Sequence, residues 1–65
     1  MLVIVNGMTH ALPEPLTLAA LLRLLSPVAP FVVARNAEVV ARSGYEQCCV
    51  QSGDRIDIVH PAAGG

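Results

Sequence analysis

The chain has 65 residues, which allows a single domain, and 54% of them are hydrophobic. Its net charge is −1, and with four arginines, no lysine and two aromatic residues it lacks the basic, stacking surface that nucleic-acid binding needs. The apolar runs are far shorter than the roughly 20 residues of a membrane span. Segment 1–5 lacks the basic start of a signal peptide, so we expect a cytoplasmic protein that binds neither nucleic acid nor membrane.

The first part of the chain predicts a hairpin and a helix. Residues 2–5 form a β-branched run, and Asn6-Gly7 is a strong signal for a two-residue turn, so residues 8–12 are expected to return antiparallel. Thr17 is a suitable N-cap for a helix that Ser26-Pro27 ends. Its apolar face consists of leucines at helical spacing, namely Leu18, Leu21, Leu22 and Leu25.

Three more strands are predicted in the rest of the chain. Residues 31–35 and 39–42 are apolar segments joined by a turn at 36–38. Residues 55–60 alternate isoleucine with polar residues and follow a turn at 51–54. Together with the first hairpin, these segments give five strands for one helix to cover.

The segment 45–50 is ambiguous and is interpreted as one helical turn followed by extended chain that buries Cys48 or Val50. Cys48 and Cys49 are adjacent, so they cannot clamp a loop as a disulfide. They also form no familiar zinc-ligand spacing with the two histidines, and we expect no metal site. At least one cysteine is expected to fill the core.

The order of the elements predicts a fold. One amphipathic helix must lie across one mixed five-stranded sheet to bury both apolar faces. A right-handed crossover leaves a space beside the first strand, which the last strand fills in parallel. We therefore expect an α+β protein with the ubiquitin-like β-grasp fold over residues 1–60, its first and last strands central and parallel, followed by a flexible tail at 61–65.

A partner-binding surface is expected on the sheet face opposite the helix, because so apolar a small domain leaves part of its apolar surface exposed. We expect Val3, Val5 and Val59 to form this patch, with Arg35 as an additional partner contact.

The C-terminal tail is the most distinctive feature of the sequence. Pro61 lacks the N–H needed to continue a strand, and Ala62-Ala63-Gly64-Gly65 are all small. A glycine backbone can enter a channel too narrow for other residues. The serines, histidines and acids form no catalytic pattern, so we expect a chain that is not itself an enzyme and that delivers its terminal carboxylate to another protein.

Residues 32–42 and 53–60, together with Gly64-Gly65, resemble the ThiS family, the sulfur-carrier proteins of thiamine thiazole biosynthesis. The resemblance covers nearly the whole chain. Two departures are Ala37, where the family commonly has glycine, and Pro61-Ala62-Ala63, where it often has a larger residue and an extra glycine.

The resemblance implies that Gly65 is the modified residue. An E1-like adenylyltransferase would use ATP to adenylate its carboxylate, and a persulfide derived from cysteine by a desulfurase would convert it to a thiocarboxylate. Thiazole synthase would accept the sulfur. Ala62, Ala63 and Gly64 would thread into the partner active sites, and the carrier, a monomer when free, would bind no cofactor itself.

Four alternatives stay open at this point. The small subunit of molybdopterin synthase shares this chemistry but is usually longer. Other sulfur carriers, or a ubiquitin-like modifier that attaches to lysines, would use the same tail. A β-grasp interaction module with an incidental Gly-Gly would not need it.

Overall fold

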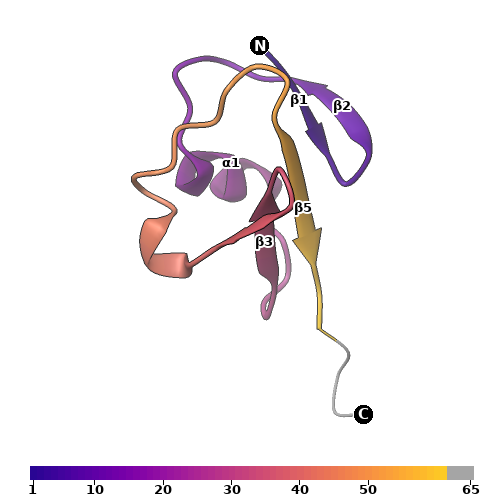
Figure 1. Cartoon of the computed structure of the whole chain (residues 1–65), viewed down its shortest axis with the longest axis vertical. Helices are drawn as coiled ribbons and strands as arrows, with labels where there is room; N and C mark the ends of the chain where they lie inside the picture. Colours follow the sequence, from indigo (N-terminus) through magenta and orange to yellow (C-terminus); the bar gives the residue numbers. More distant parts are fainter. Residues whose placement is uncertain (62–65) are drawn as a thin grey trace.

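A computed structural model describes residues 1–61 of the chain, in which one helix packs on one sheet (Figure 1). The strands are β1 (Leu2–Val5), β2 (Met8–Ala11), β3 (Val32–Arg35), β4 (Glu38–Val40) and β5 (Arg55–Val59). The helix α1 spans Leu18–Leu25, and the short 3-10 helix η1 spans Arg42–Gly44. The predictions for residues 62–65 lie outside the described residues.

The strands form a mixed sheet in the order β2-β1-β5-β3-β4. β1 pairs parallel with β5, so that Val5 lies opposite Ile56, and the other pairs are antiparallel. The prediction of a β-grasp sheet with its first and last strands side by side in the interior is therefore confirmed. β5 is the middle strand and is paired on both of its edges.

Both hairpins turn through two residues of positive φ. Asn6 and Gly7 have φ angles of 48° and 80°, as the Asn-Gly signal predicts. Asn36 and Ala37 have φ angles of 50° and 71° in the second turn. Ala37 thus adopts a left-handed conformation that glycine accepts more readily, which explains why the resemblance predicts glycine there.

The helix α1 begins and ends at local signals. The hydroxyl oxygen of Thr17 accepts the Ala20 N–H at 3.1 Å, which confirms the predicted N-cap. Ser26 has a left-handed φ of 49°, and its N–H donates to the Leu22 carbonyl at 2.8 Å, which ends the helix. β1 has the predicted bounds, and the other strands differ from the prediction by one or two residues at their ends, most at β4, because η1 begins at Arg42.

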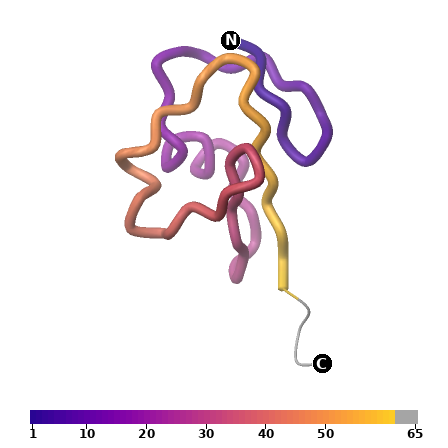
Figure 2. The backbone as a smooth tube through the Cα atoms, in the orientation of Figure 1, coloured from indigo at the N-terminus to yellow at the C-terminus, as the bar shows by residue number. Residues whose placement is uncertain are grey.

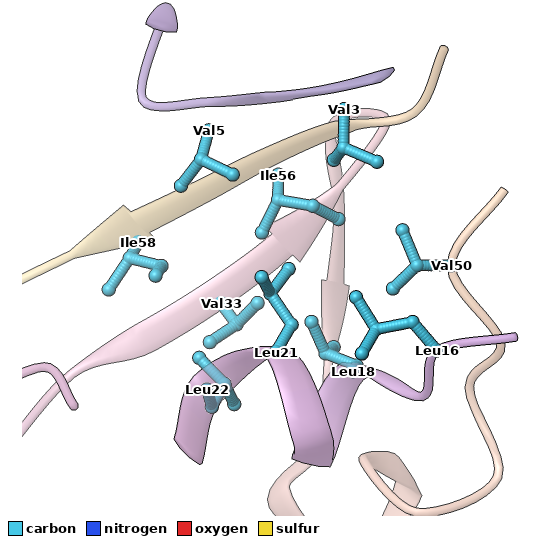
Figure 3. Close-up of a cluster of buried hydrophobic side chains, with 10 residues drawn as sticks. All are labelled: Val3, Val5, Leu16, Leu18, Leu21, Leu22, Val33, Val50, Ile56 and Ile58. Atoms are coloured by element: carbon cyan, nitrogen blue, oxygen red, sulfur yellow. The ribbon is translucent and has the colours of Figure 1, made fainter. Parts of the chain in front are cut away.

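The core lies between α1 and the sheet (Figure 3). Leucines from the helix side meet valines and isoleucines of β1, β3 and β5. The ambiguous segment supplies Val50 to this core, whereas Cys48 is half-buried against it and Cys49 is exposed. The buried cluster consists of Val3, Val5, Leu16, Leu18, Leu21, Leu22, Val33, Val50, Ile56 and Ile58.

The chain enters and leaves the domain at opposite ends. Figure 2 shows the N-terminus beside the segment that leads into β5, and the chain leaving β5 at the far end of the sheet. The central strand therefore leads directly to the C-terminal segment of the sequence.

Candidate functional site

The root of the C-terminal segment is the carboxyl end of β5. On one edge, Val59 of β5 lies opposite Val32 of β3, in the antiparallel ladder. On the other edge, β1 supplies partners only as far as Ile56, and beyond them the side-chain oxygen of Asn6 accepts the Ile58 N–H at 2.7 Å. Pro61 follows two residues after the strand ends. The chain is thus held on both edges along β5, whereas Pro61 has no backbone N–H with which to continue the strand.

The prediction that Val3 and Val5 lie on the sheet face opposite the helix is wrong. Val3 is fully buried and Val5 is nearly so, and both point into the core (Figure 3). The run at 2–5 is apolar at every position, so its composition does not show which alternate residues face inward. The neighbouring Leu2 and Ile4 occupy the other face instead.

The sheet face opposite the helix carries five exposed large apolar side chains. Val59 is one of them, as predicted, and is 56% exposed. Arg55 and Asp57 lie on the same face of β5 and pair at 3.3 Å, so one ion pair lies between the apolar residues of β1 and those of β3, β4 and the end of β5. We call this side of the sheet the open face; its exposed apolar members are Leu2, Ile4, Val32, Val39 and Val59.

Arg35 does not belong to the open face. It lies opposite Ile56 on the helix side of the sheet, where its Nε–H donates to the Asp54 carboxylate at 2.8 Å. The same carboxylate accepts the Asn36 amide at 3.1 Å and the Gln51 backbone N–H at 2.8 Å. The sequence reasoning treated Asp54 as a turn residue and missed this cluster, which joins the start of β5 to the end of β3.

The charges of this cluster reinforce each other. Burial opposes ionisation of Asp54, but hydrogen bonds from the Gln51 N–H, the Asn36 amide and the Arg35 guanidinium outweigh burial and lower its pKa below the ordinary value. The hydrogen bond to Asp54 in turn raises the pKa of Arg35. Asp54 and Arg35 are therefore both charged and hydrogen-bonded. Their contact holds the start of β5 in register with the end of β3.

Two further kinds of site could lie within residues 1–61, a metal site and a membrane-spanning helix. These residues contain no group of three or more histidine, cysteine or acidic side chains arranged to hold a metal ion. Among them, no helix is both long and apolar enough to cross a membrane. The features that remain are the root of the tail and the open face. The predicted modified residue Gly65 and the threading residues Ala62, Ala63 and Gly64 lie outside the described part.

A small β-grasp domain whose central strand leads into a C-terminal Gly-Gly belongs to the ubiquitin-like class of proteins. The chain matches the model of the ThiS family over residues 3–65, and it belongs to that family. Membership gives it a sulfur-carrier role in thiamine biosynthesis.

Two solved structures support this assignment. The crystal structure of the thiamine biosynthesis protein ThiS from Geobacter metallireducens is 28% identical, with all of both chains covered and a TM-score of 0.88. An NMR solution structure of a thiamine biosynthesis protein from the same organism is also 28% identical, covers 100% of this chain and 88% of the other, and has a TM-score of 0.80. A comparison with curated proteins gave no match.

Proposed function

We propose that this protein carries sulfur as a thiocarboxylate on Gly65 and donates it to thiazole synthase. The observation that carries the proposal is the position of β5, a strand paired on both edges that ends at Val59, six residues before Gly65 in the sequence. When extended, the five residues from Pro61 to Gly65 reach at most about 17 Å. That reach is enough for Gly65 to enter an active site while the domain stays outside.

The proposed chemistry begins with activation, because a carboxylate is a poor electrophile. An E1-like adenylyltransferase binds ATP, the Gly65 carboxylate attacks the α-phosphorus, and pyrophosphate leaves. A protein persulfide, supplied from cysteine by a desulfurase, then attacks the acyl-adenylate and displaces AMP. A thiol cleaves the resulting acyl disulfide, is itself oxidised to a disulfide, and leaves the thiocarboxylate on Gly65.

In this scheme the carrier is a co-substrate and not an enzyme. It binds no cofactor, and ATP is held by the activating partner. Gly64 keeps space for the attacking nucleophile, because a side chain next to the reacting carbon would crowd its approach. The small side chains of Ala62 and Ala63 let the tail thread into a narrow channel.

The open face supports the proposal as the docking surface. Its exposed apolar side chains Val32 and Val59 pair at the end of β5 from which the tail emerges, so a partner bound there lies close to the emerging chain. Val59 is the member nearest the end of β5. Arg35 is engaged with Asp54, and we propose for it a role in holding the strand.

ATP–pyrophosphate exchange with the cognate activating enzyme tests the activation step. The full-length chain is expected to support exchange, and a variant without Gly64 and Gly65 is expected to support none. Exchange that survives this deletion contradicts the proposal. Sulfur transfer from the loaded carrier to thiazole synthase, but not to the large subunit of molybdopterin synthase, distinguishes the thiamine role from the alternative that family membership already disfavours.

A further inference from the structure

The parallel ladder between β1 and β5 is completed by a side chain. The Asn6 backbone N–H donates to the Ile56 carbonyl at 2.9 Å, as the next residue of a strand would. The chain then turns back toward β2, so the main chain of β1 does not reach the next position. The Asn6 side-chain oxygen instead accepts the Ile58 N–H at 2.7 Å, across 52 positions of sequence.

The conformation of Asn6 makes this contact possible. Its left-handed φ of 48° belongs to the hairpin turn, and asparagine tolerates that conformation better than most residues. Figure 1 shows β5 running on past the β1–β2 turn toward the C-terminal segment. The Asn6 amide therefore covers the edge of β5 at the point where strand β1 no longer does.

The second hairpin provides an internal comparison. Asn36 holds the same turn position with a φ of 50°, and its side-chain oxygen accepts the Arg55 N–H at 2.9 Å. Both turn asparagines thus bond β5, but at opposite ends. Asn36 holds the beginning of the strand, and Asn6 holds its end beside the tail.

We propose that Asn6 is a positioning residue that fixes where the anchored strand ends and the deliverable tail begins. The inference rests on the proposed function, because it concerns the delivery of Gly65. Without the Asn6 oxygen, β5 is held after Ile56 only by β3, and the chain from Ile58 onward can fray. A partner would then have to order additional residues on binding, at an entropic cost for each one.

Three variants test this role. Asn6→Gly keeps the positive φ of the turn but removes the acceptor, whereas Asn6→Asp keeps an acceptor oxygen in place. Asn36→Gly is the control, because it removes the clamp at the other end of β5, together with the Asn36 hydrogen bond to Asp54. The readouts are amide hydrogen exchange at Ile58, relative to the amides of β3, and the KM and kcat of the carrier in ATP–pyrophosphate exchange. Circular dichroism fixes a temperature at which all variants are fully folded.

Asn6→Gly is expected to speed exchange of the Ile58 amide about three- to tenfold, as the loss of one hydrogen bond predicts. It is expected to raise the carrier KM about fivefold or more with kcat unchanged, because residues must be ordered before the chemistry. Asn6→Asp is expected to restore both values. Asn36→Gly is expected to lower stability but to leave the Ile58 amide and the KM as in the parent chain.

Unchanged Ile58 exchange or an unchanged KM in Asn6→Gly overturns the inference, and so does an equal rise in KM for Asn36→Gly. These outcomes leave the proposed function intact if the parent chain is adenylated. A parent chain that supports no exchange of pyrophosphate overturns the proposed function, and with it the role of Asn6 in delivery.

Discussion

The Arg35 guanidinium and the Asp54 carboxylate meet at 2.8 Å, although 19 positions separate them in the sequence. Arg35 ends β3, and Asp54 immediately precedes β5. Only 7% of Asp54 is exposed, so its charge depends on these partners and not on water. The pair therefore fixes the start of the strand whose other end leads to the tail.

Replacing Asp54 with asparagine is expected to reduce the free energy of unfolding by about 1–3 kcal/mol, because hydrogen bonds to a buried charge are lost. Asp57→Asn is the matched control, since Asp57 pairs with Arg55 on the open face at 3.3 Å. That change is expected to cost within about 0.5 kcal/mol. Urea denaturation measures both values, and equal losses would contradict the structural role of the cluster.

Acid is expected to weaken the same cluster. Because the folded-state pKa of Asp54 is lowered, its contribution to stability is fully present above its ordinary pKa of 3.8 and is lost as the pH falls from there through the lowered value. Urea midpoints measured at and below pH 4 are expected to fall more steeply for the parent chain than for Asp54→Asn. Parallel pH profiles for the two proteins would show that Asp54 does not carry this dependence.

Adding a charge to the open face is expected to weaken partner docking. Val59→Asp places a carboxylate where a partner must exclude water, and we expect the carrier KM in ATP–pyrophosphate exchange to rise about tenfold or more. Val28→Asp is the control, because Val28 is 77% exposed and lies in the connection between α1 and β3. The open face is not the docking surface if both variants keep the parent KM.

The left-handed Ala37 is a site where the sequence is not optimal for the fold. Ala37→Gly is expected to stabilise the protein by about 0.5–1 kcal/mol. At a φ of 71° the steric strain of alanine exceeds the extra backbone entropy that glycine loses on folding. The control Ala41→Gly acts on an alanine with an ordinary φ of −68° and is expected to destabilise by a similar amount. Thermal unfolding compares the two, and a loss of stability in Ala37→Gly would refute the strain argument.

Local signals were sufficient to predict most of the fold. Asn6-Gly7 specified the first hairpin, and Thr17 with the leucine spacing specified the helix. The order of these elements left the β-grasp as the arrangement that covers the helix face and pairs the last strand with the first.

Local signals could not predict which residues of β1 face the core, nor the polar contacts between residues far apart in the sequence. The run at 2–5 is apolar throughout, so Val3 and Leu2 are equivalent in pattern although one is buried and the other exposed. The Asn6–Ile58 contact depends on where two strands end relative to each other, which sequence spacing does not reveal. The sequence predicted an exposed apolar side of the sheet and its member Val59, but the other members were known only once the register was known.

Intact mass spectrometry tests most directly whether the activating enzymes convert the Gly65 carboxylate to a thiocarboxylate. The full chain is incubated with ATP, cysteine, the desulfurase and the cognate activating enzyme, and a variant lacking Gly64 and Gly65 is treated in parallel. We predict a mass gain equal to the exchange of one oxygen for one sulfur, located on the C-terminal peptide of the full chain alone. An unchanged mass, or the same gain in the shortened variant, would contradict the account.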